Sequence, residues 1–315
     1  MRTAASALKI LREKEGPVSG ARMASRLGLT RAAVWKAVHM LREEGYEIEG
    51  VSNRGYTLTG ETDRLSASGI ESSLSSMWSG MTVRICEKLT STSTLARQRA
   101  DTEKQLLIAA NAQTAGRGRR GRDFYSPPGA GLYFSLAMEW GREEAPVLVT
   151  TMAAVATALV LEREFGVAVG IKWVNDLYLH DRKICGILTE AVTGLESGVT
   201  ASLVIGIGIN LMEPAGGYPA PIRRIAGALV RQGTRIDRNR LISLIVNDLG
   251  SLIGRLPDRG YLDRYRERCF ILGRKVRLDT GQTIVPHAIS DEGALLYRDG
   301  NAIRSLQTGE VSILL

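Results

Sequence analysis

Histidine is scarce in this sequence. Only three occur among 315 residues, His39, His180 and His287. So few imidazoles argue against a histidine-ligated metal centre and against a Ser-His-Asp triad. Cysteine is equally rare, and the three cysteines are too scattered to form a C-x-x-C pair or a metal site. We interpret them as buried thiols of a reducing cytoplasm, and we expect no metal ligated by the chain itself.

Long apolar runs are also missing. No segment is long enough to cross a bilayer, and residues 1–11 fit a short amphipathic helix better than a signal peptide. We therefore expect a cytoplasmic protein without a membrane partner. Positive charge is in excess, with 41 Lys and Arg against 33 Asp and Glu and a net charge of +8. This excess favours anionic partners such as nucleic acid or nucleotides, and the length predicts two or three domains.

Residues 116–121, Gly-Arg-Gly-Arg-Arg-Gly, form what we call the arginine loop. Its glycines permit sharp turns, and its arginines offer planar donors to carboxylate or phosphate. The loop matches G-x-G-x-x-G, but Pro127-Pro128 stands where a dinucleotide-binding helix would begin. We interpret it as an anion-binding loop between strands at 106–113 and 132–140. A solvated turn is the less favoured alternative, because adjacent arginines repel one another unless an anion is present.

The first sixty residues predict a winged helix-turn-helix. Helices are expected over 1–11, 19–27 and 30–44, with Ser19 and Thr30 as caps and Gly28 in the left-handed region between them. Two short strands follow, at 46–51 and 56–58, around a turn at 53–55. The exposed face of the third helix is basic, so we expect it in a DNA major groove with the wing near phosphates. The alternative is a helical adaptor that binds protein. The expected DNA-binding residues are Thr30, Arg31, Trp35, Lys36 and Arg54.

The remainder predicts an α+β fold. Further helices are expected at 66–74, 91–101, 145–165, 238–255 and 258–268. Further strands are expected at 82–87, 170–174, 177–179, 183–191 and 202–209, with a tight turn at Asp181-Arg182. The last part consists of short β runs, 275–279, 283–289, 294–297, 302–306 and 310–314, typical of a small barrel. We predict three domains: 1–64, a DNA-binding winged helix; 65–271, a mixed α/β domain; and 272–315, a small β-barrel.

Polar residues interrupt this apolar middle part at the ends of its predicted elements. Hydroxyls crowd the helix start at residues 91–94, and Gln113 and Asn210 each end a strand. Such residues are either solvated or line a pocket at the sheet edge. Gly206 and Gly208, on one face of one strand, indicate that a ligand or another segment of backbone approaches closely.

Five motifs occur in order: the arginine loop, Lys-Trp-Val-Asn-Asp at 172–176, Asp-Arg-Lys at 181–183, Gly-Ile-Leu at 186–188 and Gly-Ile-Gly-Ile-Asn at 206–210. Together they resemble the biotin–protein ligase family. The N-terminal winged helix makes the chain similar to the bifunctional members, which are also biotin operon repressors. The resemblance covers essentially the whole chain and implies an SH3-like C-terminal domain.

The resemblance implies activation of biotin with ATP and Mg²⁺ to biotinyl-5′-AMP. It also implies transfer of the biotinyl group to a lysine of the biotin carboxyl carrier protein of acetyl-CoA carboxylase. The adenylate would also be the corepressor that brings a homodimer to operator DNA. Activation brings a carboxylate against a phosphate, so positioning and cationic side chains do most of the work. The scarcity of histidine fits this chemistry.

The resemblance also assigns roles to residues. The implied catalytic residues are Arg117, Arg119, Asp176 and Lys183. Biotin is expected against Ser91, Thr92, Ser93, Gln113 and Gly116. The carboxylate, the phosphates or the rest of the adenylate are expected against Arg117, Gly118, Arg119, Arg120, Arg122, Lys172, Asn175, Lys183, Gly186 and Asn210. Two alternatives stay open: Lys172 forms only an ion pair with Asp176, and Asp176 only orients the acceptor lysine instead of acting as a base.

The chain departs from the family pattern in three places. Ser93 replaces a frequent Asn, Val174 replaces a usual Pro, and the loop at 212–221 is short for one that closes over the adenylate. A ligand-responsive regulator without ligase activity is a rival hypothesis. A lipoate or octanoate transferase is another, although the Arg-Arg-x-x-Gly-Gly type of motif is missing.

Overall fold

A computed structural model describes residues 2–51, 54–141, 146–193, 200–307, 309 and 311–313. The chain divides into two compact units, Met1–Ile85 with Gly233–Asn247, and Cys86–Gln232 with Asp248–Leu315. Each unit therefore combines segments that lie far apart in the sequence. The bounds of the three domains that the sequence suggests remain predictions.

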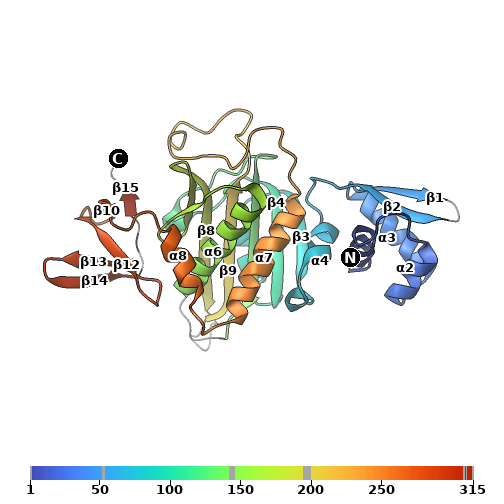
Figure 1. Cartoon of the computed structure of the whole chain (residues 1–315), viewed down its shortest axis with the longest axis horizontal. Coiled ribbons are helices and arrows are strands. Elements are labelled where there is room, and N and C mark those ends of the chain that lie inside the picture. The colour runs from blue at the N-terminus through green and yellow to red at the C-terminus, as the bar shows by residue number, and fades with distance from the viewer. Residues whose placement is uncertain are drawn as a thin grey trace. The chain divides into compact units, whose positions relative to one another are not determined.

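The first unit begins with a winged helix-turn-helix (Figure 1), built from α1 (Arg2–Arg12), α2 (Gly20–Leu27), α3 (Arg31–Glu43) and the hairpin of β1 (Glu47–Val51) and β2 (Gly55–Gly60). The predicted caps are confirmed. The Ser19 and Thr30 hydroxyls accept hydrogen bonds from the backbone N–H groups three residues on, each at 3.2 Å. Gly28 has φ of 65°, the left-handed conformation that ends a helix. Of the predicted wing turn, residue 53 lies outside the described part.

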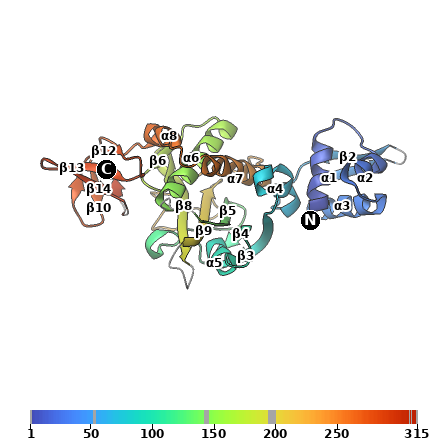
Figure 2. The same cartoon turned by 90° about the horizontal axis from the view of Figure 1, so that it is seen from below.

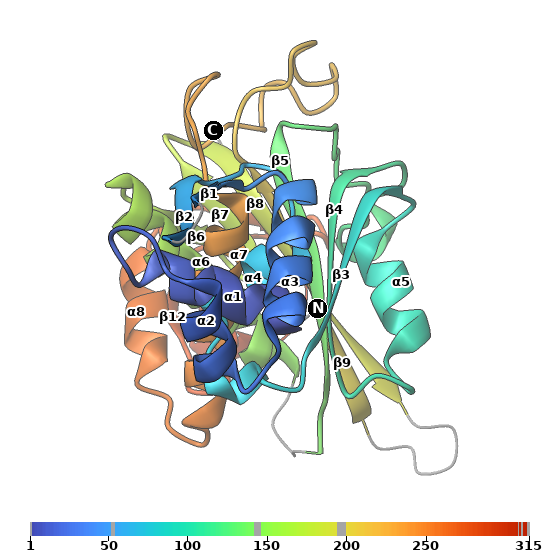
Figure 3. The ribbon, with the colours of Figure 1, turned by 90° about the vertical axis from the view of Figure 1, so that its right-hand side faces the viewer.

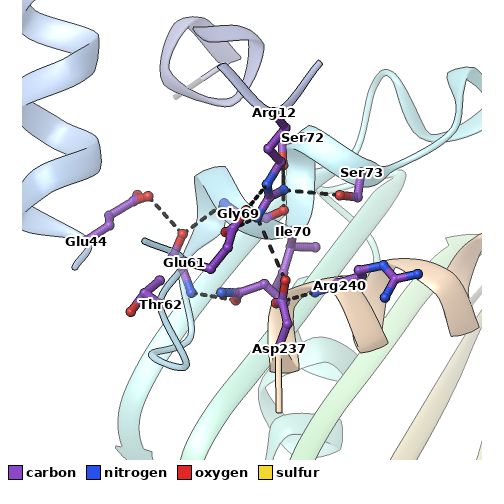
Figure 4. Close-up of polar contacts among 12 residues, drawn as sticks. Arg12, Glu44, Glu61, Thr62, Gly69, Ile70, Ser72, Ser73, Asp237 and Arg240 are labelled. Atoms are coloured by element: carbon purple, nitrogen blue, oxygen red, sulfur yellow. Dashed lines mark hydrogen bonds and ion pairs between the residues drawn. The ribbon is translucent and has the colours of Figure 1, made fainter. Parts of the chain in front are cut away.

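A polar cluster fastens α1 to the rest of this unit (Figure 4). Arg12 binds Glu61 through two nitrogens, at 2.6 and 2.7 Å, and donates to the Ser72 hydroxyl at 2.7 Å. Ser72 belongs to α4 (Ala67–Ser73), which packs on α1. Asp237, 3.9 Å from Arg12, caps α7 (Arg238–Gly254) by accepting from the Arg240 N–H at 2.9 Å. The cluster thus joins the start of α7 to the winged helix through side chains.

The second unit is built on a mostly antiparallel sheet. Strands from 82 to 210 form one seven-stranded sheet in the order β3-β4-β5-β9-β8-β7-β6. Their bounds are β3 (Thr82–Leu89), β4 (Gln105–Gln113), β5 (Gly131–Glu139), β6 (Gly170–Lys172), β7 (Asp176–Leu179), β8 (Arg182–Thr193) and β9 (Thr200–Asn210). The arginine loop connects β4 to β5, and the short 3₁₀ turn Arg119–Gly121 replaces any longer helix there. Its predicted place between two strands is confirmed.

Helices cover both faces of this sheet. α5 (Thr92–Arg99) and α6 (Pro146–Phe165) lie on opposite sides of it (Figures 2 and 3). Successive side chains of a strand alternate between faces. Gly206 of β9 faces α5, as the nearby Ser93 shows. On the neighbouring strand β8, Thr189 faces the other side of the sheet, where its hydroxyl bonds the Thr150 hydroxyl of α6 at 2.8 Å. α8 (Tyr261–Arg268) packs against α6.

Two small antiparallel sheets end the chain, in the orders β11-β10-β15 and β12-β13-β14. Their strands are β10 (Val276–Leu278), β11 (Thr283–Ile284), β12 (Pro286–Ile289), β13 (Leu295–Asp299), β14 (Ala302–Leu306) and β15 (Val311–Ile313). The run predicted over 283–289 is split at Val285, because Pro286 has no N–H to continue the ladder. Residues 308, 310 and 314 of the predicted tail lie outside the described residues. The predicted α+β class is confirmed.

One turn differs from its prediction. The β7–β8 turn is centred on His180-Asp181, with φ of 47° and 60°, and Arg182 already pairs with Leu179 as the first residue of β8. A two-residue hairpin needs positive φ at both central positions, which His and Asp tolerate better than Arg. Within the described residues, no helix is long and apolar enough to span a bilayer.

Candidate functional site

A cavity of about 480 Å³ opens on the α5 side of the sheet, entirely within the second unit. The arginine loop, the start of α5, the β6–β7 hairpin and β8 supply most of its walls. Thirteen of the sixteen predicted biotin, adenylate and catalytic residues line it. They are Thr92, Ser93, Gln113, Arg117, Gly118, Arg119, Arg120, Arg122, Lys172, Asn175, Asp176, Lys183 and Gly186.

The other three lie just behind the walls. Ser91 caps α5 by accepting from the Thr94 N–H at 3.4 Å. The Gly116 carbonyl accepts from the Phe124 N–H at 2.8 Å, and a Cβ at this position would overlap the Phe124 carbonyl. Asn210, at the end of β9, donates to the Lys183 carbonyl at 3.4 Å. These residues support the lining without forming it.

One end of the cavity is lined by a buried chain of neutral polar groups. Gln113 accepts from the Thr92 N–H at 2.8 Å through Oε1 and donates to the Ser126 hydroxyl at 2.8 Å through Nε2. Ser135 of β5 bonds the hydroxyls of both Thr92 and Ser93, at 2.8 and 3.0 Å. Every group here has a partner, as buried polar groups require. Hydroxyls and an amide in this arrangement can both donate to and accept from an uncharged polar ligand.

A second part of the lining is cationic. Lys183 Nζ lies 2.6 Å from Asp176 Oδ1, and Lys172 Nζ lies 4.0 Å from Asp176 Oδ2. The Lys172–Asp176 contact joins partners across the β6–β7 hairpin, not neighbours on a helix. The Trp173–Val174 peptide in this hairpin is cis. Asp176 thus contacts both lysines, and arginine and lysine side chains outnumber the aspartates in the lining as a whole, which suits an anionic ligand.

The arginine loop folds back on itself beside these lysines. The Gly118 N–H donates to the Arg122 carbonyl at 2.7 Å, and Arg120 has φ of 55°, in the left-handed region. Arg119 donates to the Asn175 side chain at 3.2 Å. Three arginines of the loop line one wall, so the cavity combines planar donors from the loop with ammonium groups from β6 and β8.

Glycines make room for the parts that approach the sheet. A Cβ at Gly208 would lie 2.6 Å from the Phe124 ring, and one at Gly186 would lie 3.2 Å from it. Gly186 and Gly208 are cross-strand partners, so the ring lies over both. A Cβ at Gly206 would overlap the Ser93 hydroxyl. A close approach is therefore present at Gly206 and Gly208, but the side chains of Ser93 and Phe124 make it and not a second backbone segment.

Several lining residues escaped the sequence analysis. Tyr178, Ile222, Arg224 and Ser312 line the cavity, and Ser135 orders its neutral end. Ser312 comes from β15 in the C-terminal sheet, and no local pattern marks it. Ser135 lies between buried apolar residues of β5, and a hydroxyl inside such a run was the available signal.

The predicted DNA-binding residues lie in the first unit. Thr30, Arg31, Trp35, Lys36 and Arg54 are all exposed. Trp35 is the most conspicuous, because 55% of a large apolar side chain is accessible, with the His39 ring edge-on at 5.5 Å. Single exposed hydrophobic side chains are common on protein surfaces, so the exposure of Trp35 does not by itself mark a binding surface. The roles of these residues remain predictions.

Comparison with known proteins agrees with this architecture. The Biotin/lipoate A/B protein ligase family matches residues 84–210, and an HTH domain matches residues 3–57. The fold is shared by the Aquifex aeolicus biotin protein ligase in complex with biotin and ATP. That structure is 23% identical, has a TM-score of 0.61, and the match covers 73% of this chain and 97% of that one. Fold, cavity and matches thus define a class, a protein ligase of the biotin/lipoate type that carries a helix-turn-helix domain.

Two curated relatives narrow the class. The bifunctional ligase/repressor BirA of Escherichia coli (strain K12) is 32% identical, over 94% of this chain and 92% of the relative. The bifunctional ligase/repressor BirA of Bacillus subtilis (strain 168) is 31% identical, over 94% of both. The chain belongs to the family of bifunctional BirA ligase/repressors.

Proposed function

We propose that this protein activates biotin with ATP to biotinyl-5′-AMP, transfers the biotinyl group to a lysine of biotin carboxyl carrier protein, and uses the adenylate as corepressor at operator DNA. The observation that carries the proposal is a single cavity with a neutral hydrogen-bonding end and a cationic end. A ligand that is a neutral bicyclic urea at one end and a carboxylate at the other suits both.

The neutral end would hold the ureido ring. Thr92, Ser93, Gln113 and the newly identified Ser135 form one hydrogen-bonded chain whose hydroxyls can reorient. Ser93 contributes a hydroxyl where the family often has an amide, and Ser135 is already its partner at 3.0 Å. The pair therefore offers a rotatable donor and acceptor in place of a fixed amide.

The cationic end would bring two anions together. In activation, a biotin carboxylate oxygen forms a bond to the α-phosphorus of ATP, and the bond from that phosphorus to the bridging oxygen of pyrophosphate breaks. Arg117, Arg119 and Lys183 would offset the charge on the carboxylate and on the phosphoryl oxygens. Arg120, Arg122 and Lys172 extend the same wall toward the leaving pyrophosphate. Positioning supplies the remaining rate enhancement.

Mg²⁺ would enter with the triphosphate. Among the described residues, no group of three His, Cys, Asp or Glu side chains could hold a metal ion. Asp123, Asp176 and Asp181 do line the cavity as separate carboxylates. This fits an ion that keeps several waters and binds through one or two carboxylates and the nucleotide phosphates, whose charge it would partly neutralise.

In transfer, the lysine amine of the carrier protein attacks the carbonyl carbon of the mixed anhydride and AMP leaves. Asp176 is 2.6 Å from Lys183, so its carboxylate already orients a cation of the site. This contact favours an orienting role for Asp176, because a general base would have to give up that partner to accept a proton.

Repression would follow from linkage. If the adenylate favours a homodimer, the dimer presents two winged helices to a palindromic operator, and DNA in turn favours the adenylate-bound form. The exposed basic face of α3 and Arg54 of the wing supply the contacts. Such a regulator would act in the cytoplasm.

Incubation of the purified chain with ATP, Mg²⁺, biotin and apo carrier protein tests the enzyme. We expect biotinylation of one carrier lysine. We also expect the Arg119→Ala variant to bind biotinyl-AMP more than tenfold more weakly than the wild type. Absent biotinylation combined with adenylate-dependent operator binding would establish the rival regulator without ligase activity. Calorimetric titration with lipoate in place of biotin tests the transferase alternative, which requires the lipoate to bind more tightly.

A further inference from the structure

Three arginines within four residues should repel one another unless anions balance them. Two carboxylates of this chain are placed to do so. Glu190 of β8 accepts from Arg117, with its two oxygens 3.1 and 3.4 Å from Nη1. Asp279, directly after β10, forms an ion pair with Arg120. Neither acid belongs to the motifs of the family resemblance.

The two acids hold the loop from two different sheets. Glu190 is only 17% exposed and also lies 3.8 Å from Arg97 of α5, so its carboxylate is fixed between two guanidinium groups. Asp279 extends from the C-terminal sheet whose strand β15 contributes Ser312 to the cavity wall. The arginine loop is therefore fastened both to β8 of the seven-stranded sheet and to a separate small sheet.

The position of Arg120 indicates that the second contact shapes the backbone. Arg120 is in the left-handed region, which a residue with a Cβ adopts only when its surroundings hold it there. Its ion pair with Asp279 is a contact that can do so. Arg119, between the two fastened arginines, instead donates to Asn175, which itself lines the cavity.

We propose that Glu190 and Asp279 are positioning residues that tether the arginine loop over the cavity and limit how fast a bound adenylate escapes. The tether itself is a property of this chain, and only its effect on escape rests on the proposed ligase function. Glu190 and Asp279 do not touch the reacting atoms. They act through Arg117 and Arg120.

Limited trypsin digestion of the full-length protein tests the tether directly, because trypsin cleaves after arginine. We expect Glu190→Gln and Asp279→Asn to raise cleavage after Arg117 and Arg119 severalfold in the absence of biotin and ATP, as mapped by mass spectrometry. One matched control is Glu139→Gln at the end of β5, which loses a pair with Lys104. The other is Asp299→Asn, which loses a pair with Arg304 in the C-terminal sheet. Both should be cleaved like wild type.

A charge exchange distinguishes tethering from general loosening. Arg120→Asp and Asp279→Arg should each expose the loop, and the double exchange should restore protection at Arg117 and Arg119. Wild-type cleavage rates in Glu190→Gln and Asp279→Asn, or failure of the exchange to restore protection, would overturn the tether. Faster cleavage throughout the chain would also count against it, because that pattern means global unfolding.

Release of preformed biotinyl-adenylate, followed by chase with unlabelled biotin and ATP, tests the consequence. We expect severalfold faster release from the two tether variants and unchanged release from the two controls. Unchanged release from a loosened loop would overturn the effect on escape. If the wild-type chain forms no adenylate, the proposed function fails, whereas the digestion still decides whether the loop is tethered.

Discussion

Single side chains decide the shape of this cavity. Phe124 lies over Gly186 and Gly208, and Ser93 lies over Gly206, so the three glycines set the depth of the floor. At each of these positions the lack of a side chain lets the neighbouring Phe124 or Ser93 pack directly on the strand. Glycine inside a strand weakens the strand. Here the glycines allow the close packing that shapes the cavity.

Gly208→Ala is expected to push Phe124 toward the ligand space. The added Cβ would lie 2.6 to 2.9 Å from three atoms of the ring, which must move away from β9. Overpacking of this kind costs about 1–3 kcal/mol, so biotin affinity should fall about tenfold to a hundredfold in a calorimetric titration. Gly254→Ala, where a Cβ meets nothing within 4 Å, is the matched control. Unaltered affinity in Gly208→Ala would mean that the ring is not part of the floor.

Asp176→Asn separates an orienting carboxylate from a general base. If Asp176 orients Lys183, the variant lowers the rate of adenylate formation as well as the rate of transfer, because both use the same cation. We expect losses of about tenfold or more in both steps. Loss confined to transfer from preformed adenylate would instead identify the carboxylate as the base for the acceptor lysine. Single-turnover kinetics of the two half-reactions make the distinction.

Among the elements, the caps were the most predictable features. Ser19, Thr30, Ser66 and Ser91 each accept from a backbone N–H three residues on, an interaction fixed by a few neighbouring residues. The arginine loop was placed correctly between two strands because prolines and glycines mark it locally. The turn at His180-Asp181 was misplaced by one residue, because the chain there contains no glycine to identify the positive-φ positions.

The contacts that complete the site could not be read from local patterns. Glu190 is 73 residues from Arg117, and Asp279 is farther still from Arg120. Ser312 reaches the cavity only because β15 pairs with β10. Side chains like these become visible when the sheet order is known, since nothing in their own neighbourhood distinguishes them from solvated residues.

The start of α7 carries a pH-dependent contribution to stability. Burial raises the pKa of Asp237 above its usual value. The hydrogen bond from the Arg240 N–H and the charge of Arg12 lower the pKa, and the charge of Glu61 raises it, but burial is the largest effect and the net shift is upward. An acid with a raised folded-state pKa stabilises the fold most below its unfolded pKa, about 3.9, and loses that contribution as the pH rises through the folded value.

Asp237→Asn should therefore raise the free energy of unfolding of the first unit at pH 7, since the amide can still accept from the Arg240 N–H. The gain should vanish at about pH 3, where the carboxyl is protonated in both the folded and the unfolded state. Urea titrations at the two pH values provide the measurement, with Asp63→Asn on the exposed linker as control. A variant less stable than wild type at pH 7 would show that the contact with Arg12 outweighs burial.

At the scale of the whole molecule, the charge excess of +8 is consistent with a partner that carries phosphates. If Lys36 contacts an operator phosphate, Lys36→Ala should weaken binding to all sequences alike. The slope of log K against log salt should become shallower by about one for each winged helix bound. Lys9→Ala, on the exposed side of α1, should leave the slope unchanged. Altered sequence preference in Lys36→Ala would instead indicate contact with a base.

The division of the chain into two units has a consequence for truncation experiments. Residues 233–247 belong to the first unit although they come late in the sequence. Asn239 accepts from the Ser66 N–H and donates to the Arg64 carbonyl, both at 2.8 Å, while it is fully buried. Removal of residues 1–64 thus strips a buried amide of one partner and takes Arg12 and Glu61 away from the start of α7. A chain shortened in this way keeps residues 233–247 without some of their packing partners. Any loss of ligase activity would then reflect this local destabilisation as well as the missing DNA-binding domain.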